Sequence, residues 1–218
     1  MRSKIRHGRP NHRQNLGTQS SCLLCFRDLN LIPNLTELLS DRDVLCVPCR
    51  NVLKTQKHQF KVGSLPVRSL YEYASDIQNL LIRYKESGDM ALKDLFLAPH
   101  RSWFKRLYRG YLGILVPSHE QHISLRGFNH LPLIYQDTID LFEGVQKTGS
   151  FRQMAHSAIQ RQEISFTLTK TLPKGYRGYV ILDDVVTTGA TIQAVASVLP
   201  STAVRVSAFS IAFHPFFK

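Results

Sequence analysis

The sequence predicts an α/β fold with a mainly parallel sheet, preceded by a small cysteine-containing module. Short apolar runs rich in β-branched and aromatic residues alternate with helical segments, which is the pattern of βα units. The clearest run, residues 179–182 (YVIL), is apolar throughout, as expected of an interior strand covered on both faces. All four cysteines fall within the first 50 residues, in two closely spaced pairs. The pairs therefore indicate a separate module.

Turn signals and periodicity predict the order of the elements. We expect strands at 65–73, 111–117, 164–168, 179–182 and 204–213, and helices at 74–86, 90–107 (interrupted by Pro99), 129–144 and 191–199. Residues 119–122 are expected to form a loop. The 218-residue chain is long enough for one such domain and a small module. Its longest apolar run, 111–117, is far shorter than the roughly 20 residues of a membrane-spanning helix.

The cysteines form two C-x₂-C pairs separated by 20 residues: Cys22 with Cys25, and Cys46 with Cys49. This is the spacing of a tetrahedral Cys₄ zinc site. Disulfides are disfavoured because the first 15 residues are polar and basic, unlike a secretory signal. A redox role for one pair would not explain the other. We expect a structural zinc site, since four thiolates leave no coordination position open for chemistry.

The chain is strongly basic, with a formal net charge of +12 and a pI near 9.8, which implies a polyanionic partner. Residues 1–15 carry five of the basic side chains and no acid, so residues 1–19 are expected to form a disordered basic extension. A second run without acids, 50–61, reads as either a linker or one face of a helix.

A third basic cluster lies within residues 100–111, where four basic residues alternate with aromatic ones. Basic groups that follow a backbone, beside aromatics available for stacking, are typical of single-strand nucleic-acid binding. Alternatively, the aromatic residues pack on the sheet and the basic face is merely solvated. We favour packing for the aromatics and leave the basic face open. The candidate nucleic-acid-binding residues are Arg101, Lys105, Arg106 and Arg109.

Two adjacent carboxylates, Asp183 and Asp184, follow the apolar run 179–182. Open α/β sheets bind ligands outside the carboxyl ends of their strands, and paired carboxylates there suit the vicinal hydroxyls of a ribose. The next turn, 187–191 (TTGAT), offers backbone N–H groups and hydroxyls to a phosphate. A strand, turn and helix without a ligand would leave the two acids unexplained. A Walker B strand would need a P-loop, and the nearest candidate, 144–150 (GVQKTGS), lacks the lysine that must follow the second glycine.

Residues 179–191 resemble the signature of type I phosphoribosyltransferases at every position. The resemblance implies a parallel-sheet phosphoribosyltransferase-like domain that binds phosphoribosyl pyrophosphate (PRPP). The acidic pair would hold the ribose 2′- and 3′-hydroxyls, and Mg²⁺ would accompany PRPP to neutralise the leaving pyrophosphate. The 5′-phosphate would be held by the turn residues Thr187, Thr188, Gly189, Ala190 and Thr191.

Signature and cysteines together resemble the ComF family. Three further elements carry this resemblance in the same order: Tyr84-Lys85-x-x-Gly88-Asp89, Val116-Pro117 and Arg126-Gly127-Phe128-Asn129. The Arg126 guanidinium fits pyrophosphate oxygens, with Lys85 beside it, although Lys85 also reads as a surface helix residue and Gly127 as a plain turn. His130 and His122 stand where the family commonly has Gln and Arg. Gln153 and Arg161 reproduce a family spacing, but we assign them no role.

The ComF resemblance implies three parts: the extension 1–19, a zinc-finger module and linker 20–62, and a phosphoribosyltransferase-like domain 63–218. It implies a competence protein of natural transformation that takes up or handles single-stranded DNA. Partners would be PRPP, single-stranded DNA and a competence helicase or translocase. The location would be cytoplasmic, either free or peripheral at the inner face of the membrane. Two alternatives stay open: a phosphoribosyltransferase of nucleotide metabolism, and a PRPP-sensing adaptor without turnover. Whether the protein is an enzyme stays open, because no acceptor or general base is evident.

Overall fold

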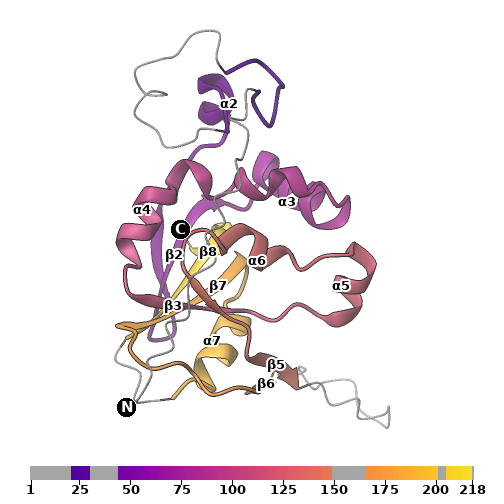
Figure 1. Cartoon of the computed structure of the whole chain (residues 1–218). Coiled ribbons are helices and arrows are strands. Elements are labelled where there is room, and N and C mark those ends of the chain that lie inside the picture. Colours follow the sequence, from indigo (N-terminus) through magenta and orange to yellow (C-terminus); the bar gives the residue numbers. More distant parts are fainter. Residues whose placement is uncertain (1–20, 30–43, 149–164, 201–204, 218) are drawn as a thin grey trace, which may run out of the picture.

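The computed structural model describes residues 21–29, 44–148, 165–200 and 205–217. The predicted extension 1–19, Gln153 and Arg161 lie outside the described residues. The chain forms an α/β domain around one twisted sheet, with the cysteine-containing segment at one end (Figure 1).

The central sheet has six strands in the order β1-β2-β8-β7-β3-β4. Only β1 runs antiparallel, against β2; the other neighbours are parallel, which confirms the predicted mainly parallel α/β fold. The apolar runs of β7 and β8 are buried at its centre, as expected of strands covered on both faces. The strands are β1 (His58–Val62), β2 (Leu65–Glu72), β3 (Tyr111–Leu115), β4 (Asp140–Phe142), β7 (Gly178–Val186) and β8 (Val206–Phe213).

Helices cover both faces of the sheet: in Figure 1, α3, α4 and α6 lie above it and α7 lies below. The aromatic residues of α4 and α6 pack on Phe209 of β8, with Phe104 edge-on at 4.8 Å between ring centroids. Phe104 and Tyr108 are buried, so the packing interpretation of these aromatics is confirmed. The helices are α2 (Val47–Val52), α3 (Ser75–Glu86), α4 (Arg101–Leu107), α5 (Glu120–Arg126), α6 (His130–Tyr135) and α7 (Ala190–Ser197).

Three expected elements differ from the structure. The helix at 129–144 is wrong: α6 ends at Tyr135, and β4 and β5 (Val145–Thr148) follow, the latter pairing antiparallel with β6 (Ser165–Leu168) outside the main sheet. The helix at 90–107 is split into the 3₁₀ turns η1 (Met90–Asp94) and η2 (Ala98–His100) and then α4, since Pro99 cannot continue an α-helix. Residues 119–122 lead into helix α5, because His119 caps it by accepting the Gln121 N–H.

A strand that we did not predict, β1, lies in the segment assigned to the linker. It pairs with β2 through the turn at Gly63, whose φ of +60° suits glycine. Residues 58–62 thus belong to the sheet edge rather than to the cysteine-containing segment. The last 3₁₀ turn, η3 (Pro215–Phe217), packs on this edge, where the Phe60 and Phe217 rings stack at 4.4 Å.

Candidate functional site

The acidic pair lies near the carboxyl end of β7, in the middle of the sheet. Strand pairing continues past it, with Asp183 opposite Ser210 and Val186 opposite Phe213, so the pair sits inside the strand rather than just after it. The correction is small in position, because only Val185 and Val186 of β7 follow the pair. Both carboxylates still face the end of the sheet at which α/β proteins bind ligands.

Asp184 is buried and carries two basic partners from two helices. Its Oδ2 forms an ion pair with Lys85 Nζ of α3 and lies 2.8 Å from His130 Nε2 of α6, while Oδ1 accepts the Val185 N–H at 2.7 Å. Burial alone would raise the pKa of Asp184. The Lys85 ammonium and the His130 contact outweigh burial and hold that pKa below its usual range, so Asp184 is an anion.

His130 has a defined tautomer. An ionised carboxylate only accepts hydrogen bonds, so Nε2 carries the proton that it donates to Asp184. On the other side of the ring, Nδ1 lies 3.3 Å from Arg126 Nη1, which only donates, and 3.5 Å from Ser118 Oγ. Nδ1 is therefore an acceptor. We did not predict a role for His130 from the sequence. The only signal for one was its position directly after Asn129 of the Arg126–Asn129 element.

Asp183 has the opposite electrostatic situation. Its Oδ1 accepts the Asp184 N–H at 2.9 Å, and its backbone oxygen accepts the Tyr135 hydroxyl at 2.8 Å. Burial, followed by repulsion from the Asp184 charge, raises the pKa of Asp183 to about 8. The two adjacent acids therefore differ in their electrostatics, since the pKa of Asp184 is lowered and the pKa of Asp183 is raised.

A cavity of about 180 Å³ brings the predicted residues together. Lys85, Arg126, Asp183 and Asp184 all line it, together with Ser118 and the three histidines 119, 122 and 130. Lys85 is thus a cavity residue rather than a surface one. Arg126 Nη2 contacts Glu86 Oε1 at 3.2 Å, but among the described residues its buried Nε has no hydrogen-bond partner, and neither has Asn129 Oδ1. Such orphaned polar atoms are what a polar ligand would satisfy.

The TTGAT turn lies beside this cavity without lining it. Thr187 and Thr188 are exposed, Thr191 is half-buried, and the Thr188 hydroxyl accepts the Ala190 N–H at 3.4 Å. Gly189 begins α7 in a left-handed conformation, with φ of +80°. Its Cα faces Val62 of β1 so closely that a Cβ would overlap the valine methyl groups. The β1–β2 hairpin therefore forms one wall of the turn.

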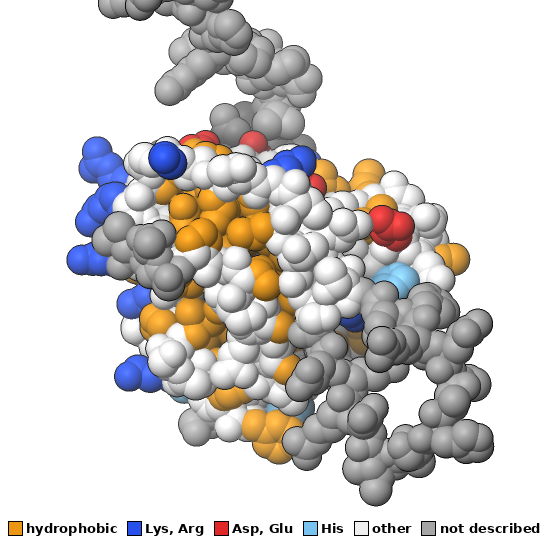
Figure 2. Space-filling model, turned by 90° about the horizontal axis from the view of Figure 1, so that it is seen from below, with side chains coloured by type: hydrophobic (Ala, Val, Ile, Leu, Met, Phe, Trp, Pro, Cys, Tyr) orange, Lys and Arg blue, Asp and Glu red, His pale blue; other side chains and the backbone are white. Residues whose placement is uncertain are grey.

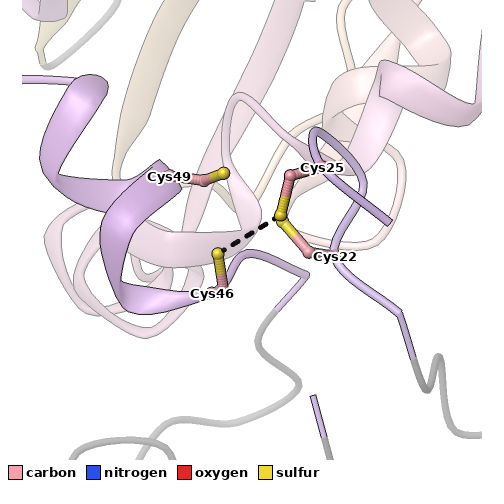
Figure 3. Close-up of side chains that lie close together, drawn as sticks. All are labelled: Cys22, Cys25, Cys46 and Cys49. Atoms are coloured by element: carbon pink, nitrogen blue, oxygen red, sulfur yellow. Dashed lines mark hydrogen bonds between the residues drawn. The ribbon is translucent and has the colours of Figure 1, made fainter. Parts of the chain in front are cut away.

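The four cysteines converge as their spacing predicted (Figure 3). Their sulfur atoms lie within 4.8 Å of one another, and Cys25 Sγ is 3.6 Å from Cys46 Sγ. A tetrahedral zinc ion with 2.3 Å bonds would place its sulfurs about 3.8 Å apart, so the cluster suits zinc. None of the four is in a disulfide. Burial and the neighbouring sulfurs raise the pKa of Cys49, and a bound cation would offset that repulsion.

The basic cluster of residues 101–109 contains one ion-paired arginine and three exposed basic residues. Arg101 Nη2 contacts Asp94 Oδ1 at 3.2 Å, and its Nη1 lies 4.0 Å from Asp137 Oδ2, which accounts for this side chain structurally. Lys105, Arg106 and Arg109 are exposed.

These features define an α/β protein with a mainly parallel sheet and a four-cysteine cluster near its amino terminus. The chain is 25% identical over 221 residues to the competence protein ComFC of Streptococcus pneumoniae (strain ATCC BAA-255 / R6), covering 87% of this chain and 98% of that protein. This similarity over most of both chains supports membership of the ComF family, as a distant relative. No model of a known protein family matches the chain. Within the described residues, every helix is too short or too polar to cross a membrane.

Proposed function

We propose that this protein serves natural competence by handling single-stranded DNA during uptake, and that its phosphoribosyltransferase-type site binds PRPP with Mg²⁺. The similarity to a competence protein ComFC supports the competence role. The net charge of +12 supports a nucleic-acid partner. On this proposal the protein is cytoplasmic, either free or peripheral at the membrane's inner face, and works with a competence helicase or translocase.

The observation that carries the PRPP proposal is the cavity in which two cations and two carboxylates converge. Lys85 and Arg126 supply positive charge for pyrophosphate oxygens, and Asp183 and Asp184 supply acceptors for ribose hydroxyls. Packing does not explain two cations and two carboxyl groups, one of them held as an anion, around one cavity at a strand's carboxyl end. A polyanionic sugar phosphate explains both signs of charge.

Each residue would act through an atom that the geometry identifies. The unpartnered Arg126 Nε and the Lys85 ammonium would donate to pyrophosphate. The Thr187 and Thr188 hydroxyls, the N–H groups of Gly189 and Ala190, and Thr191 would surround the 5′-phosphate. Mg²⁺ bound with PRPP would screen its negative charge, and the raised pKa of Asp183 fits a site that gains its second anion only when a cation arrives.

The zinc module would be structural. Four thiolates complete the coordination of a zinc ion, so its free energy of binding goes into ordering residues 20–62. We retain the three-part division into 1–19, 20–62 and 63–218 as a proposal, with the qualification that 58–62 pair with the sheet.

A calorimetric titration with PRPP and Mg²⁺ tests the site. We expect a binding heat for the wild type and none for Asp183→Asn/Asp184→Asn. Thr187→Val, at an exposed position, should weaken binding without affecting the fold. Circular dichroism of each variant separates loss of binding from loss of structure. Equal heats for wild type and the folded variants would contradict the assigned site.

A further inference from the structure

A row of arginines lies at the end of the sheet opposite the acidic pair. Arg109, Arg177 and Arg205 come at or just before the first residues of β3, β7 and β8, which are neighbours in the sheet. Backbone hydrogen bonds hold the starts of these three strands side by side. The Arg177 N–H donates to Gly110 O at 2.7 Å, and the Tyr179 N–H donates to Arg205 O at 2.8 Å. All three side chains are exposed.

The three arginines precede neighbouring strands, so their backbones form one row along the amino end of the sheet. Three adjacent strands span about 10 Å, so neighbouring guanidinium groups can meet successive phosphates of an extended strand. Seen from below, Lys and Arg side chains gather along one margin of the molecule, on the left of the view (Figure 2). The motif was not evident from the sequence, since the three arginines are far apart along the chain.

A second cavity, of about 370 Å³, opens beside this row. Tyr111 and Tyr176 line it, together with Lys105, Arg109, Asp137 and Asp140. The Tyr111 ring packs against Gly178, since a Cβ added to this glycine would lie 2.8 Å from the ring. The Tyr176 hydroxyl donates to Asp140 Oδ2 at 3.1 Å. The volume falls within the usual range of small-molecule sites, about 300 to 1,000 Å³.

The chemistry of this cavity favours a nucleobase over a phosphate. Tyrosine rings offer stacking surfaces, and carboxylates accept hydrogen bonds from exocyclic amino groups but repel phosphate oxygens. Phosphates would instead lie outside, on Arg109, Arg177 and Arg205. A base paired within a duplex could not enter, so the arrangement selects single strands.

We infer that single-stranded DNA binds along this edge, with its phosphates on the arginine row and a base in the tyrosine-lined cavity. The inference rests on the DNA-handling role proposed above and assigns it a surface. The edge is well separated from the acidic pair, because Asp183 comes five positions after Gly178 along β7, a rise of about 17 Å. The two sites should therefore bind their ligands independently.

Fluorescence anisotropy with a labelled 15-nucleotide single strand tests the row. For Arg109→Gln/Arg177→Gln/Arg205→Gln we expect affinity at about 100 mM salt to fall about tenfold or more, and the salt slope to decrease by about 2, since each phosphate contact contributes roughly 0.7. The matched control, Lys54→Gln/Lys61→Gln/Arg83→Gln, removes three charges elsewhere and should change affinity less than twofold. An equal loss in both triple variants would overturn the proposed row and indicate binding by net charge only.

The base pocket has its own test. Tyr111→Leu/Tyr176→Leu should lower affinity for the normal strand about tenfold, since stacking of one base contributes about 1–3 kcal/mol. It should not change affinity for an abasic strand of equal length, and this second probe does not depend on variant stability. Equally tight binding of normal and abasic strands by the wild type would overturn the pocket, and so would equally tight binding of a duplex.

The outcomes also separate this inference from the proposed function. If the wild type binds no single strand, the DNA-handling role fails and the surface fails with it. If the wild type binds but none of the edge variants changes affinity, only the surface assigned here is wrong. The PRPP heat should be the same in all edge variants.

Discussion

The two ends of the central sheet are charged in different ways. At the carboxyl end, charges of both signs are paired: buried Asp184 meets Lys85, and the mostly enclosed Arg126 meets the exposed Glu86. At the amino end, Arg109, Arg177 and Arg205 are exposed and of one sign. Buried ion pairs are costly to break and constrain the shape of a binding site. Exposed cations cost little free energy and attract anionic ligands from a distance. One sheet can thus carry a selective pocket and a permissive polyanion surface.

The largest expected effect on stability comes from removing the buried ion pair at the carboxyl end of the sheet. Asp184→Asn leaves the Lys85 ammonium without its anionic partner in a largely enclosed site, so we expect a loss of about 3–5 kcal/mol in the free energy of unfolding, measured in urea. Asp89→Asn is the matched control, because its partner Arg83 is half-exposed, and it should cost less than about 1 kcal/mol. Similar losses in both variants would remove the contrast between buried and exposed pairs.

The next largest effect on stability should come from the TTGAT turn, residues 187–191. Gly189→Ala introduces a Cβ at φ of +80° against Val62, and we expect about 2–3 kcal/mol of destabilisation together with weaker PRPP binding. Gly127→Ala is an informative control for stability, because its φ of +77° is nearly the same but nothing lies within 4 Å. The difference in unfolding free energy between the two variants isolates the overlap with Val62. No difference would mean that the hairpin does not confine the turn.

Replacing Asp183 should have a smaller effect of opposite sign, a gain in the free energy of unfolding. Its pKa is raised from 3.8 to about 8, so the folded protein retains a proton that the unfolded chain has released, and stability falls as pH rises between these values. Asp183→Asn should therefore stabilise the protein by about 1–2 kcal/mol at pH 8. Thermal unfolding at pH 5, 6.5 and 8 should show the gain over wild type growing with pH. A gain that is the same at all three would contradict the raised pKa.

The smallest effect on stability should come from the amino end. Arg177→Gln changes an exposed side chain, so its unfolding free energy should stay within about 0.5 kcal/mol of wild type. Its salt slope for single-stranded DNA should nevertheless decrease by about 0.7. A variant that loses stability but keeps the slope would reverse the assignment of this edge as a binding surface.

Local patterns predicted the features that are themselves local. The apolar run of β7 predicted an interior strand, and the C-x₂-C spacing predicted a cluster of four sulfurs. Both predictions rest on a pattern that lies within a few residues. The order of β and α segments predicted a parallel sheet, which the strand pairing confirms. Lys85, Arg126 and the acidic pair line one cavity, and their role in binding PRPP stays a prediction.

The elements that sequence reasoning missed depend on distant partners. The strand β1 is a short basic segment that becomes a strand by pairing with β2, and β4 has three residues that complete the far edge against β3. The role of His130 comes from meeting Asp184, 54 residues away. The arginine row exists only when β3, β7 and β8 lie side by side. None of these has a periodicity from which it could be inferred.

The internal pairing of Asp184 has a consequence for discrimination. A pentose whose hydroxyls donate hydrogen bonds to this carboxylate would compete with the Lys85 ammonium, which would then need another partner. If the site binds PRPP as proposed, the pyrophosphate would give the displaced lysine a new counter-ion, whereas free ribose or an uncharged nucleoside would leave it without one. Binding would then be an exchange of ionic partners that disfavours sugars without phosphate.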